Sequence, residues 1–383
     1  MSVTEPQGFT AAGVPAGLKN SGARDIALVV NTGPRQAAAA VFTSNRAVAN
    51  PIIWSRQVVL DGVVSAIVLN SGGANCFTGE QGFHATHATA EAVGEALSVS
   101  SSDVLVCSTG LIGEQLDVAK IQAGVADAAG ELASDGGLHA AEAIMTTDTH
   151  PKTAVRSRGG YAIGGMAKGA GMLAPGLATM LVTITTDADL NARSLDRALR
   201  SATRQTFDRL DSDGCMSTND QVTLLASGAS GTVPDEGEFT ELLTELCHDL
   251  AGQLQRDAEG ASHDIAITVT QAASEDDALE VARSVARNNL FKTAIFGNDP
   301  NWGRVLAAIG TTSAVFDPYN VDVSMNGVRV CHAGGPDEPR ERVDLTDREC
   351  TVLIELNSGD ESATILTNDL THDYVHENSA YSS

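Results

Sequence analysis

The sequence predicts a mixed α/β or α+β protein, and two observations support that prediction. Apolar runs of strand length stop at clusters of small residues, as in "VSAIVL" before "NSGGAN" and "VLVC" before "STGLIG". Amphipathic stretches with the period of a helix follow these runs along the chain. Because both patterns recur along the 383 residues, neither an all-α nor an all-β fold is expected.

In chain order, buried strands are expected at Val64–Leu69 and Val104–Cys107, each ending in a turn whose backbone amides are available to a ligand. Helices should follow over 84–97 and 117–132. The clearest predicted helix covers 237–260. Its apolar side chains form one stripe, made of Phe239, Leu242, Leu243, Leu246, Leu250 and Leu254.

The last third of the chain predicts a second, smaller α/β unit. An alternating strand, "DIAITVT", is followed by a helix that opens with a capping box of Ser274 and Asp277. Further on, an Asn326-Gly327 pair lies between two alternating runs, as in a β-hairpin. We therefore expect a larger domain over 1–274 and a smaller one over 275–383.

Composition limits the classes of partner. The chain has 24 basic and 49 acidic residues, a formal net charge of −25, so nucleic acid and anionic membranes are not expected to bind. No signal peptide is expected from "MSVTEPQGFTAAGVPAG", and no apolar run has the length of a membrane span. Six scattered cysteines without a C-x-x-C pair fit reduced thiols, so a cytoplasmic protein is expected.

Three motifs suggest cofactor sites but fail on their spacing. In "HATH", His84 and His87 have no carboxylate at ligand spacing, so a solvated helix face is the better interpretation. In "DRLDSDGCMSTND", Arg209 stands where a calcium loop needs its first carboxylate. The loop "GGMAKGAGMLAPG" lacks the residue order of a phosphate-binding loop. No metal and no cofactor are therefore expected.

One stretch remains, "MAKGAGMLAPGLATMLVTITTDA" over 166–188, in which a glycine-rich loop containing Lys168 ends at Ala178 and a strand-like run begins at Thr179. Threonine is common in strands, so Thr179 has a purely structural interpretation. The functional interpretation is that its hydroxyl attacks the preceding carbonyl and the chain is cut there. The new α-amino group, with a pKa of about 7.7–8.0, would then act as general base for the hydroxyl. The residues alone leave both interpretations open.

This stretch resembles the self-cleavage segment of the ornithine acetyltransferase (glutamate N-acetyltransferase) family. The resemblance extends in order over nearly the whole chain through "LNSGGANCFTG", "CSTGLIG", "IMTTDT", "TFDRLDSDGCMSTND", "DAEGAS", "FGNDPNWGRV" and "ENSAYSS". Many members have Asn-Met where this chain has Gly176-Leu177. Glycine still permits the turn, so cleavage is expected.

The resemblance implies a layered αββα sandwich similar to the self-processing amidohydrolases with an amino-terminal nucleophile, and a smaller carboxyl-terminal α/β domain. It implies cleavage between Ala178 and Thr179 into chains 1–178 and 179–383, with Thr179 as nucleophile. Thr109 and Gly110 would stabilise the oxyanion, as a hydroxyl and backbone amides in a small-residue turn can do. The implied substrate-binding residues are Thr146, Lys168, Thr179, Glu259, Asn378 and Ser383.

The implied reaction is a ping-pong transfer of an acetyl group from N2-acetylornithine to glutamate through an acetyl-Thr179 ester, within cyclic arginine biosynthesis. No cofactor is implied, and acetyl-CoA stays open as a second acetyl donor, as does a place in specialised metabolism. The two fragments would associate as α2β2. Two alternatives remain: an aminopeptidase or amidase of the same self-processing fold, and an uncleaved small-molecule binding protein in which Thr179 is structural.

Overall fold

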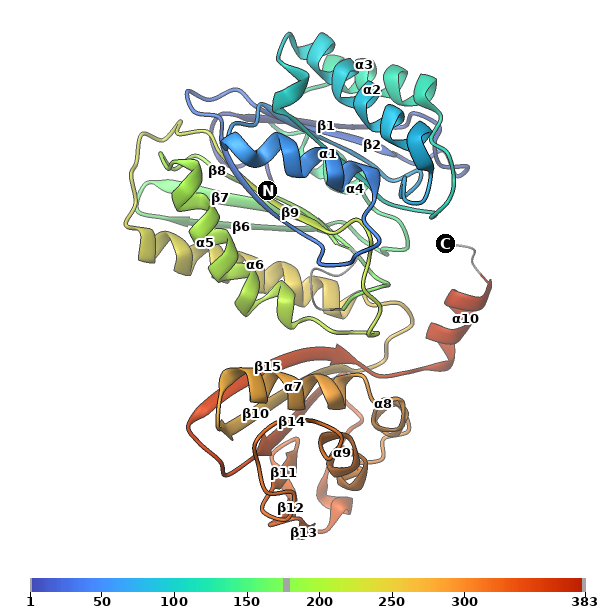
Figure 1. Ribbon diagram of the computed structural model, residues 1–383, viewed down its shortest axis with the longest axis vertical. Helices are drawn as coiled ribbons and strands as arrows, with labels where there is room; N and C mark the ends of the chain where they lie inside the picture. The colour runs from blue at the N-terminus through green and yellow to red at the C-terminus, as the bar shows by residue number, and fades with distance from the viewer. Residues whose placement is uncertain (1, 175–179, 381–383) are drawn as a thin grey trace.

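The computed structural model describes residues 2–174 and 180–380, whose strands form three β-sheets (Figure 1). The first sheet has the order β1-β2-β4-β5, in which β4 and β5 run parallel and the other pairs antiparallel. Its strands are β1 (Phe9–Val14), β2 (Ile26–Asn31), β4 (Ala66–Asn70) and β5 (Val104–Ser108).

The second sheet has the order β3-β9-β8-β7-β6, and only β8 and β9 run parallel. Its strands are β3 (Ala37–Phe42), β6 (Lys152–Arg158), β7 (Tyr161–Lys168), β8 (Leu181–Thr186) and β9 (Gln221–Ala226). Every residue of β8 and β9 is buried, as expected for strands covered on both faces.

These two sheets pack face to face, and helices cover their outer faces (Figure 1). The first is covered by α2 (Gly79–Leu97) and α3 (Val118–Gly130), and the second by α5 (Ala192–Gln205) and α6 (Glu236–Arg256). Between the sheets, side chains such as Leu69 and Leu225 form a common core. Two shorter helices, α1 (Asn50–Val58) and α4 (Gly137–Ala143), pack at the flanks. The layers confirm the predicted αββα sandwich.

The third sheet forms a smaller unit with its own apolar core and has the order β13-β12-β11-β14-β10-β15. Its strands are β10 (Asp264–Ala272), β11 (Asp322–Met325), β12 (Val328–His332), β13 (Gly335–Pro336), β14 (Glu349–Glu355) and β15 (Glu361–Asn368). Its helices are α7 (Glu275–Ala286), α8 (Asn289–Phe296) and α9 (Trp302–Ile309), and α10 (His372–Ala380) follows β15. Short 3₁₀ turns cover Val59–Asp61, Ser101–Asp103, Phe207–Arg209 and Arg340–Arg342.

Two local predictions for this unit are confirmed. Ser274 accepts a hydrogen bond from the amide of Asp277 at 3.1 Å and caps α7, and β11 and β12 form the hairpin around Asn326. The strand β10 lies before the proposed boundary at residue 274, yet it pairs with β14 and β15 of the smaller unit. A boundary in the turn between α6 and β10 would keep this sheet whole.

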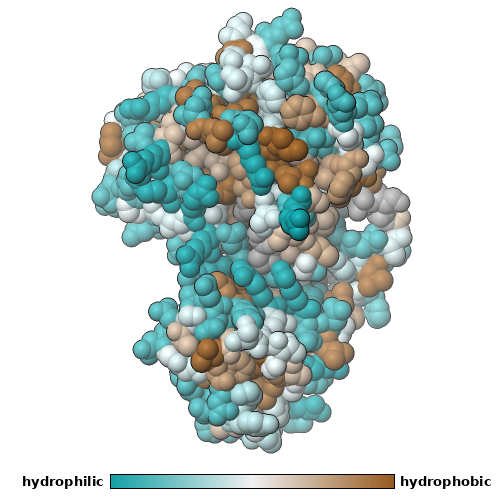
Figure 2. Space-filling view, viewed as in Figure 1, coloured by the Kyte–Doolittle hydropathy of each residue, from teal (hydrophilic) through white to brown (hydrophobic). Residues whose placement is uncertain are grey.

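The view in Figure 2 shows a group of hydrophobic residues on the larger unit near α1, while the smaller unit mixes hydrophobic residues at its centre with hydrophilic ones around them. Within residues 2–174 and 180–380, no helix combines the length and the apolar character that a bilayer span requires. Five cysteines are buried and Cys215 is exposed, and all six are free thiols.

Candidate active site

The predicted residues Ala178, Thr179 and Ser383 lie outside the described residues, so the site is built from their surroundings. The backbone amide of Met180, which follows Thr179 in the chain, donates a hydrogen bond to Asp220 Oδ1 at 3.0 Å. Leu181 then begins β8 and lies opposite Lys168, the last residue of β7. The prediction that Lys168 lies in a loop is therefore wrong, because the glycine-containing stretch before it is paired as β7.

The parallel strands β4 and β5 end side by side, and this brings their two turns into backbone contact. Thr109 N donates to Asn70 O at 2.9 Å, and Gly73 N donates to Thr109 O at 3.0 Å. Gly110 has a φ of 126°, and a Cβ there would lie 2.9 Å from Gly73 N. Only glycine fits both the backbone angle and the close approach. The turn of Thr109 and Gly110 therefore has a fixed conformation.

Lys168 connects this turn to the second sheet. Its side chain is buried, and Nζ donates a hydrogen bond to Thr109 Oγ1 at 3.1 Å. Burial lowers the pKa of Lys168, and the nearby carboxylates Asp148, Asp220 and Glu259 oppose that shift. The structure thus brings together two residues, Lys168 and Thr109, that the sequence assigned to one site from separate motifs.

Asp148 organises the segment that precedes β6. Its Oδ1 accepts hydrogen bonds from the amide of Gly169 at 2.6 Å and from Lys152 Nζ at 2.7 Å, and its Oδ2 accepts from the amide of Thr146 at 2.9 Å. Burial acts to raise the pKa of Asp148. The positive charges of Lys168 and Lys152 outweigh it and hold the pKa at about 2. The carboxylate is therefore ionised at neutral pH although it is buried.

A second buried carboxyl group behaves in the opposite way. Asp220 is completely buried, and its desolvation raises its pKa well above the ordinary value, although the amide of Met180 favours the ionised form. Asp220 directly precedes β9 and so lies beside the start of β8. The Asp220 carboxyl group therefore holds its proton more tightly than an exposed aspartate does.

A cavity of about 620 Å³ lies next to these residues and holds three of the predicted substrate-binding side chains. Thr146, Glu259 and Asn378 all line it. Glu259 Oε1 accepts a hydrogen bond from Thr147 Oγ1 at 2.8 Å, and Oε2 accepts from Asn378 Nδ2 at 3.0 Å. The helix α6 ends at Arg256, so Glu259 lies in the turn beyond it. Glu259 is therefore held by two hydrogen bonds in this turn.

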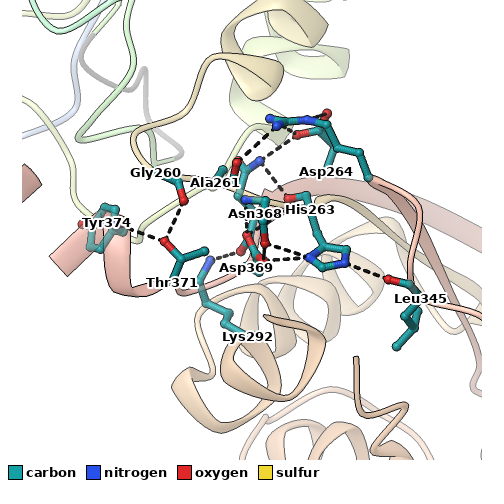
Figure 3. A network of polar contacts seen from close by, with 12 residues as sticks. Gly260, Ala261, His263, Asp264, Lys292, Leu345, Asn368, Asp369, Thr371 and Tyr374 are labelled. Carbon is teal, nitrogen blue, oxygen red and sulfur yellow. Dashed lines mark hydrogen bonds and ion pairs between the residues drawn. The ribbon is translucent and has the colours of Figure 1, made fainter. Parts of the chain in front are cut away.

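The carboxyl-terminal helix α10, which carries Asn378, is anchored over this turn. Thr371 Oγ1 donates to Gly260 O at 2.6 Å and accepts from the amide of Tyr374 at 3.0 Å (Figure 3). Just before it, Asp369 accepts a hydrogen bond from the amide of His263 at 3.1 Å. These bonds join the loop after α6 to the segment that enters α10. A tail that would fray on its own is thereby fixed beside Glu259.

Sequence reasoning gave no role to Asp148, Lys152 and Asp257, which form a buried ionic cluster that reaches the cavity wall at Asp257. Lys152 Nζ contacts Asp148 Oδ1 at 2.7 Å and Asp257 Oδ2 at 2.6 Å, and Lys152 is fully buried. The i,i+4 spacing of Asp148 and Lys152 was a visible signal. Asp257 is 105 residues away from Lys152, and no local pattern connects them.

Among residues 2–174 and 180–380 there is no group of three or more His, Cys, Asp or Glu side chains arranged to hold a metal ion. His84 and His87 instead lie near Glu80 and Glu91 on the side of α2 that faces solvent, at 3.6 Å in each case.

Comparison with known proteins decides the family. The sequence model of the ArgJ family matches residues 10–383. The chain belongs to the ArgJ family. The arginine biosynthesis bifunctional protein ArgJ of Streptomyces coelicolor is 62% identical over 383 residues, which cover both chains completely. The protein of the same description from Mycobacterium leprae is 53% identical over 389 residues, covering all of this chain and 96% of the relative.

Among solved structures, the ornithine acetyltransferase of Mycobacterium tuberculosis, complexed with ornithine, is 52% identical and matches with a TM-score of 0.45. The match covers 47% of this chain and 96% of that chain. This member of the ArgJ family is an acyltransferase of arginine biosynthesis, as the sequence predicted.

Proposed function

We propose that the chain cuts itself between Ala178 and Thr179 and then transfers an acetyl group from N2-acetylornithine to glutamate through an acetyl-Thr179 ester. The observation that supports this most directly is the contact between Lys168 and Thr109 beside the start of β8. A hydroxyl donor and a buried cation therefore lie beside Leu181, which is two residues after Thr179 in the sequence. Such groups stabilise the negative charge that develops on a carbonyl oxygen under nucleophilic attack.

In the proposed cleavage, Thr179 Oγ attacks the carbonyl carbon of Ala178 and the amide bond becomes an ester. Water then hydrolyses the ester, which leaves a carboxylate on Ala178 and a free α-amino group on Thr179. That amino group takes the hydroxyl proton in the next step, so that one residue supplies both nucleophile and base. The amino group must be neutral to do so, and its ordinary pKa of about 7.7–8.0 allows this near neutral pH.

In the first half-reaction, Thr179 Oγ attacks the acetyl carbonyl of N2-acetylornithine, and Thr109 and Gly110 bind the oxyanion. The carbon–nitrogen bond breaks, the amine of ornithine takes the proton, and the acetyl ester remains on Thr179. In the second half-reaction, the amine of glutamate attacks this ester and leaves as N-acetylglutamate. Water has to be kept from the ester between the two steps, since otherwise acetate would be released.

The cavity and the end of β7 together offer groups for both substrates. The carboxylate of Glu259, in the cavity wall, suits an ammonium group. The ammonium of Lys168, which is buried against Thr109 and is not part of the cavity wall, suits a carboxylate. Thr146 and Asn378 add polar contacts on the cavity wall, and Ser383 belongs to the same proposed set. We further propose that the processed chains form a cytoplasmic α2β2 assembly. Acetyl-CoA is a second acetyl donor to be tested.

Mass spectrometry of the purified protein, before and after brief incubation with N2-acetylornithine, tests the proposal. We expect a fragment that begins at Thr179 and gains the mass of one acetyl group. Thr179→Ala should abolish both cleavage and acetylation, while Thr179→Ser, which keeps a hydroxyl, should retain both at a reduced rate. A cleaved and acetylated Thr179→Ala chain would overturn the assignment.

Analysis of the products released from N2-acetylornithine, with and without glutamate, separates the alternatives. A transferase should give N-acetylglutamate only when glutamate is present. A hydrolase of the same fold would release acetate or amino acids without any acceptor. A full-length chain that binds N2-acetylornithine and never cleaves would be the small-molecule binding protein.

A further inference from the structure

We propose that Asp148 is a positioning residue for acyl transfer. It holds Lys168 so that the ammonium donates to Thr109 Oγ1 and directs the Thr109 hydroxyl proton toward the oxyanion. This inference rests on the proposed function, because it concerns the strength of one oxyanion donor. Asp148 is assigned no contact with the substrate.

The first step of the argument is the single proton of the Thr109 hydroxyl. Thr109 Oγ1 accepts a hydrogen bond from Lys168 Nζ at 3.1 Å, so its own proton must point elsewhere. Within the described part of the chain, no acceptor for that proton is found. The backbone of Thr109 is fixed at both ends by Asn70 and Gly73, and the residue is 2% exposed. A buried hydroxyl with a fixed position and an unused proton is a pre-arranged donor.

The second step is the effect of the ammonium on that donor. A hydroxyl that accepts a hydrogen bond from a cation is polarised and donates more strongly, because successive hydrogen bonds reinforce one another in a low-dielectric interior. The contact between Lys168 and Thr109 is shielded from water, since both side chains are buried. Lys168 therefore strengthens the bond from Thr109 to an oxyanion as long as it carries its charge.

The third step is what keeps Lys168 charged and in place. Asp148 binds the amide of Gly169, the residue after Lys168, at 2.6 Å and so fixes the backbone at the end of β7. Its carboxylate also favours the ammonium form of Lys168 through space. Lys152 holds Asp148 from the other side and is itself held by Asp257. A charged carboxylate clamped in this way cannot turn away from Lys168.

The charged groups that face Lys168 come from several elements. Asp148 lies just before β6, and Lys152 is its first residue. Asp220 precedes β9, and Glu259 follows α6. Lys19 lies between β1 and β2. The three carboxyl groups favour the charged form of Lys168, and the two lysines oppose it. Asp148 is the one that also contacts the backbone next to Lys168.

Two substitutions in the processed enzyme test the role of Asp148, because they should shift the pH dependence of acetylation in opposite directions. The rate of Thr179 acetylation should fall at high pH as Lys168 loses its proton. Asp148→Asn removes a negative neighbour and lowers the pKa of Lys168, so this fall should move to lower pH. Lys152→Gln removes a positive neighbour, so the fall should move to higher pH. A purely structural role for the cluster would give both variants the same fall in rate and no opposite shifts, and that result would overturn the inference.

A double-mutant cycle then tests the route through Thr109. Thr109→Ala should lower the acetylation rate by about 10²–10³-fold, the usual effect of losing one oxyanion donor. Adding Asp148→Asn to Thr109→Ala should cause little further loss, because the donor that Asp148 supports is already absent. In Thr109→Ser, which keeps the hydroxyl, Asp148→Asn should retain its full effect. Independent, multiplicative losses in both backgrounds would contradict the inference.

The unaltered enzyme keeps this test separate from the proposed function. If it does not transfer acetyl groups, the proposed function fails. If it does and the cycle is multiplicative, only the role of Asp148 fails. Should Asp148→Asn not give folded, processed protein, Lys152→Gln decides alone: a shift to higher pH supports the inference, and no shift or a shift to lower pH overturns it.

Discussion

Two buried lysines in different parts of the molecule differ in how many of their ammonium protons are already used in hydrogen bonds. Lys292, on α8 of the smaller unit, donates hydrogen bonds from Nζ to Ser212 O at 2.5 Å, to Thr367 Oγ1 at 3.2 Å and to Asn368 O. An ammonium group has three protons, so Lys292 has used its whole capacity. Lys168 has one hydrogen bond among the described residues, to Thr109, and therefore keeps donors for a ligand.

The surroundings explain this difference. Lys292 lies where the end of β15 meets the loop that contains Ser212, and Figure 3 shows it beside Asp369. Burial lowers its pKa to about 8, although Asp213, Asp211 and Asp369 oppose the shift. Lys292 joins three segments of the chain through their oxygens, and nothing in that geometry needs a substrate. The number of satisfied donors separates the two lysines better than burial does.

The largest expected effect is a direct test of this contrast. Lys292→Met should lower the free energy of unfolding by about 3 kcal/mol or more, because it leaves buried carbonyl groups without their donor. Lys168→Met should cost less stability but lower kcat by about 10²-fold. Urea unfolding and steady-state kinetics on both variants provide the measurement.

Lys120→Met is the matched control, because Lys120 is exposed and donates only to Gly17 O at 2.8 Å among the described residues. It should change neither quantity appreciably. The contrast between the two buried lysines breaks down if Lys168→Met destabilises the protein as strongly as Lys292→Met does.

A smaller effect concerns the carboxylate that faces Lys168. The pKa of Asp148 is about 2 in the folded protein, below the ordinary value of 3.8, so the unfolded chain takes up the proton first as the pH falls. The shift corresponds to about 2 kcal/mol of stability, which is present above about pH 4 and lost as the pH falls toward 2. Asp148→Asn should lack this loss.

Urea unfolding at a series of acidic pH values would measure this loss of stability. The free energies of unfolding of the unaltered protein and of Asp148→Asn should converge as the pH falls from 4 to 2. The exposed Asp347→Asn serves as the control and should keep the pH dependence of the unaltered protein. A constant difference between the two curves over this range would count against ionised, paired Asp148.

The smallest expected effect links the smaller unit to the cavity. Thr371→Val removes the hydrogen bond to Gly260 O that anchors α10, and so loosens Asn378 beside Glu259. One hydrogen bond contributes about 1 kcal/mol, so KM for N2-acetylornithine should rise about fivefold while kcat stays the same. Ser379→Ala, which removes only a bond within α10, should leave KM unchanged. Equal KM values for Thr371→Val and the unaltered enzyme would show that the anchor has no influence on the site.

The sequence predicted those parts of the fold whose signals are local. Alternation, helical periodicity, the Ser274 cap and the Asn326-Gly327 turn depend on neighbouring residues, and the structure confirms each of them. The stretch up to Lys168 was misread as loop because of its glycines. Gly164 in fact lies within β7, where a Cβ would come within 2.2 Å of Ser2 O. Its glycine permits close packing of the amino-terminal segment on the strand.

The sequence named several residues of the candidate site, but it did not predict the contacts between them. The motifs named Thr109, Lys168, Glu259 and Asn378, but Glu259 meets Asn378 across 119 residues of chain. Such contacts arise from the topology of three sheets, and no spacing in the sequence encodes them. Asp148 was overlooked because its partners include a backbone amide, Gly169 N, which leaves no trace in residue identity. Thr179 and Ser383 stay predictions, since they lie outside the described residues.

The strand order of the second sheet has a consequence for the enzyme after the proposed cut. Strand β9, from the later fragment, is inserted between β3 of the earlier fragment and β8, while β7 of the earlier fragment pairs with β8 on its other side. The fragments interdigitate, so neither can dissociate without melting the sheet. A nicked enzyme of this kind should denature in one cooperative transition, at a temperature that falls on dilution because melting separates the two fragments. While folded, it should not exchange fragments with a labelled copy.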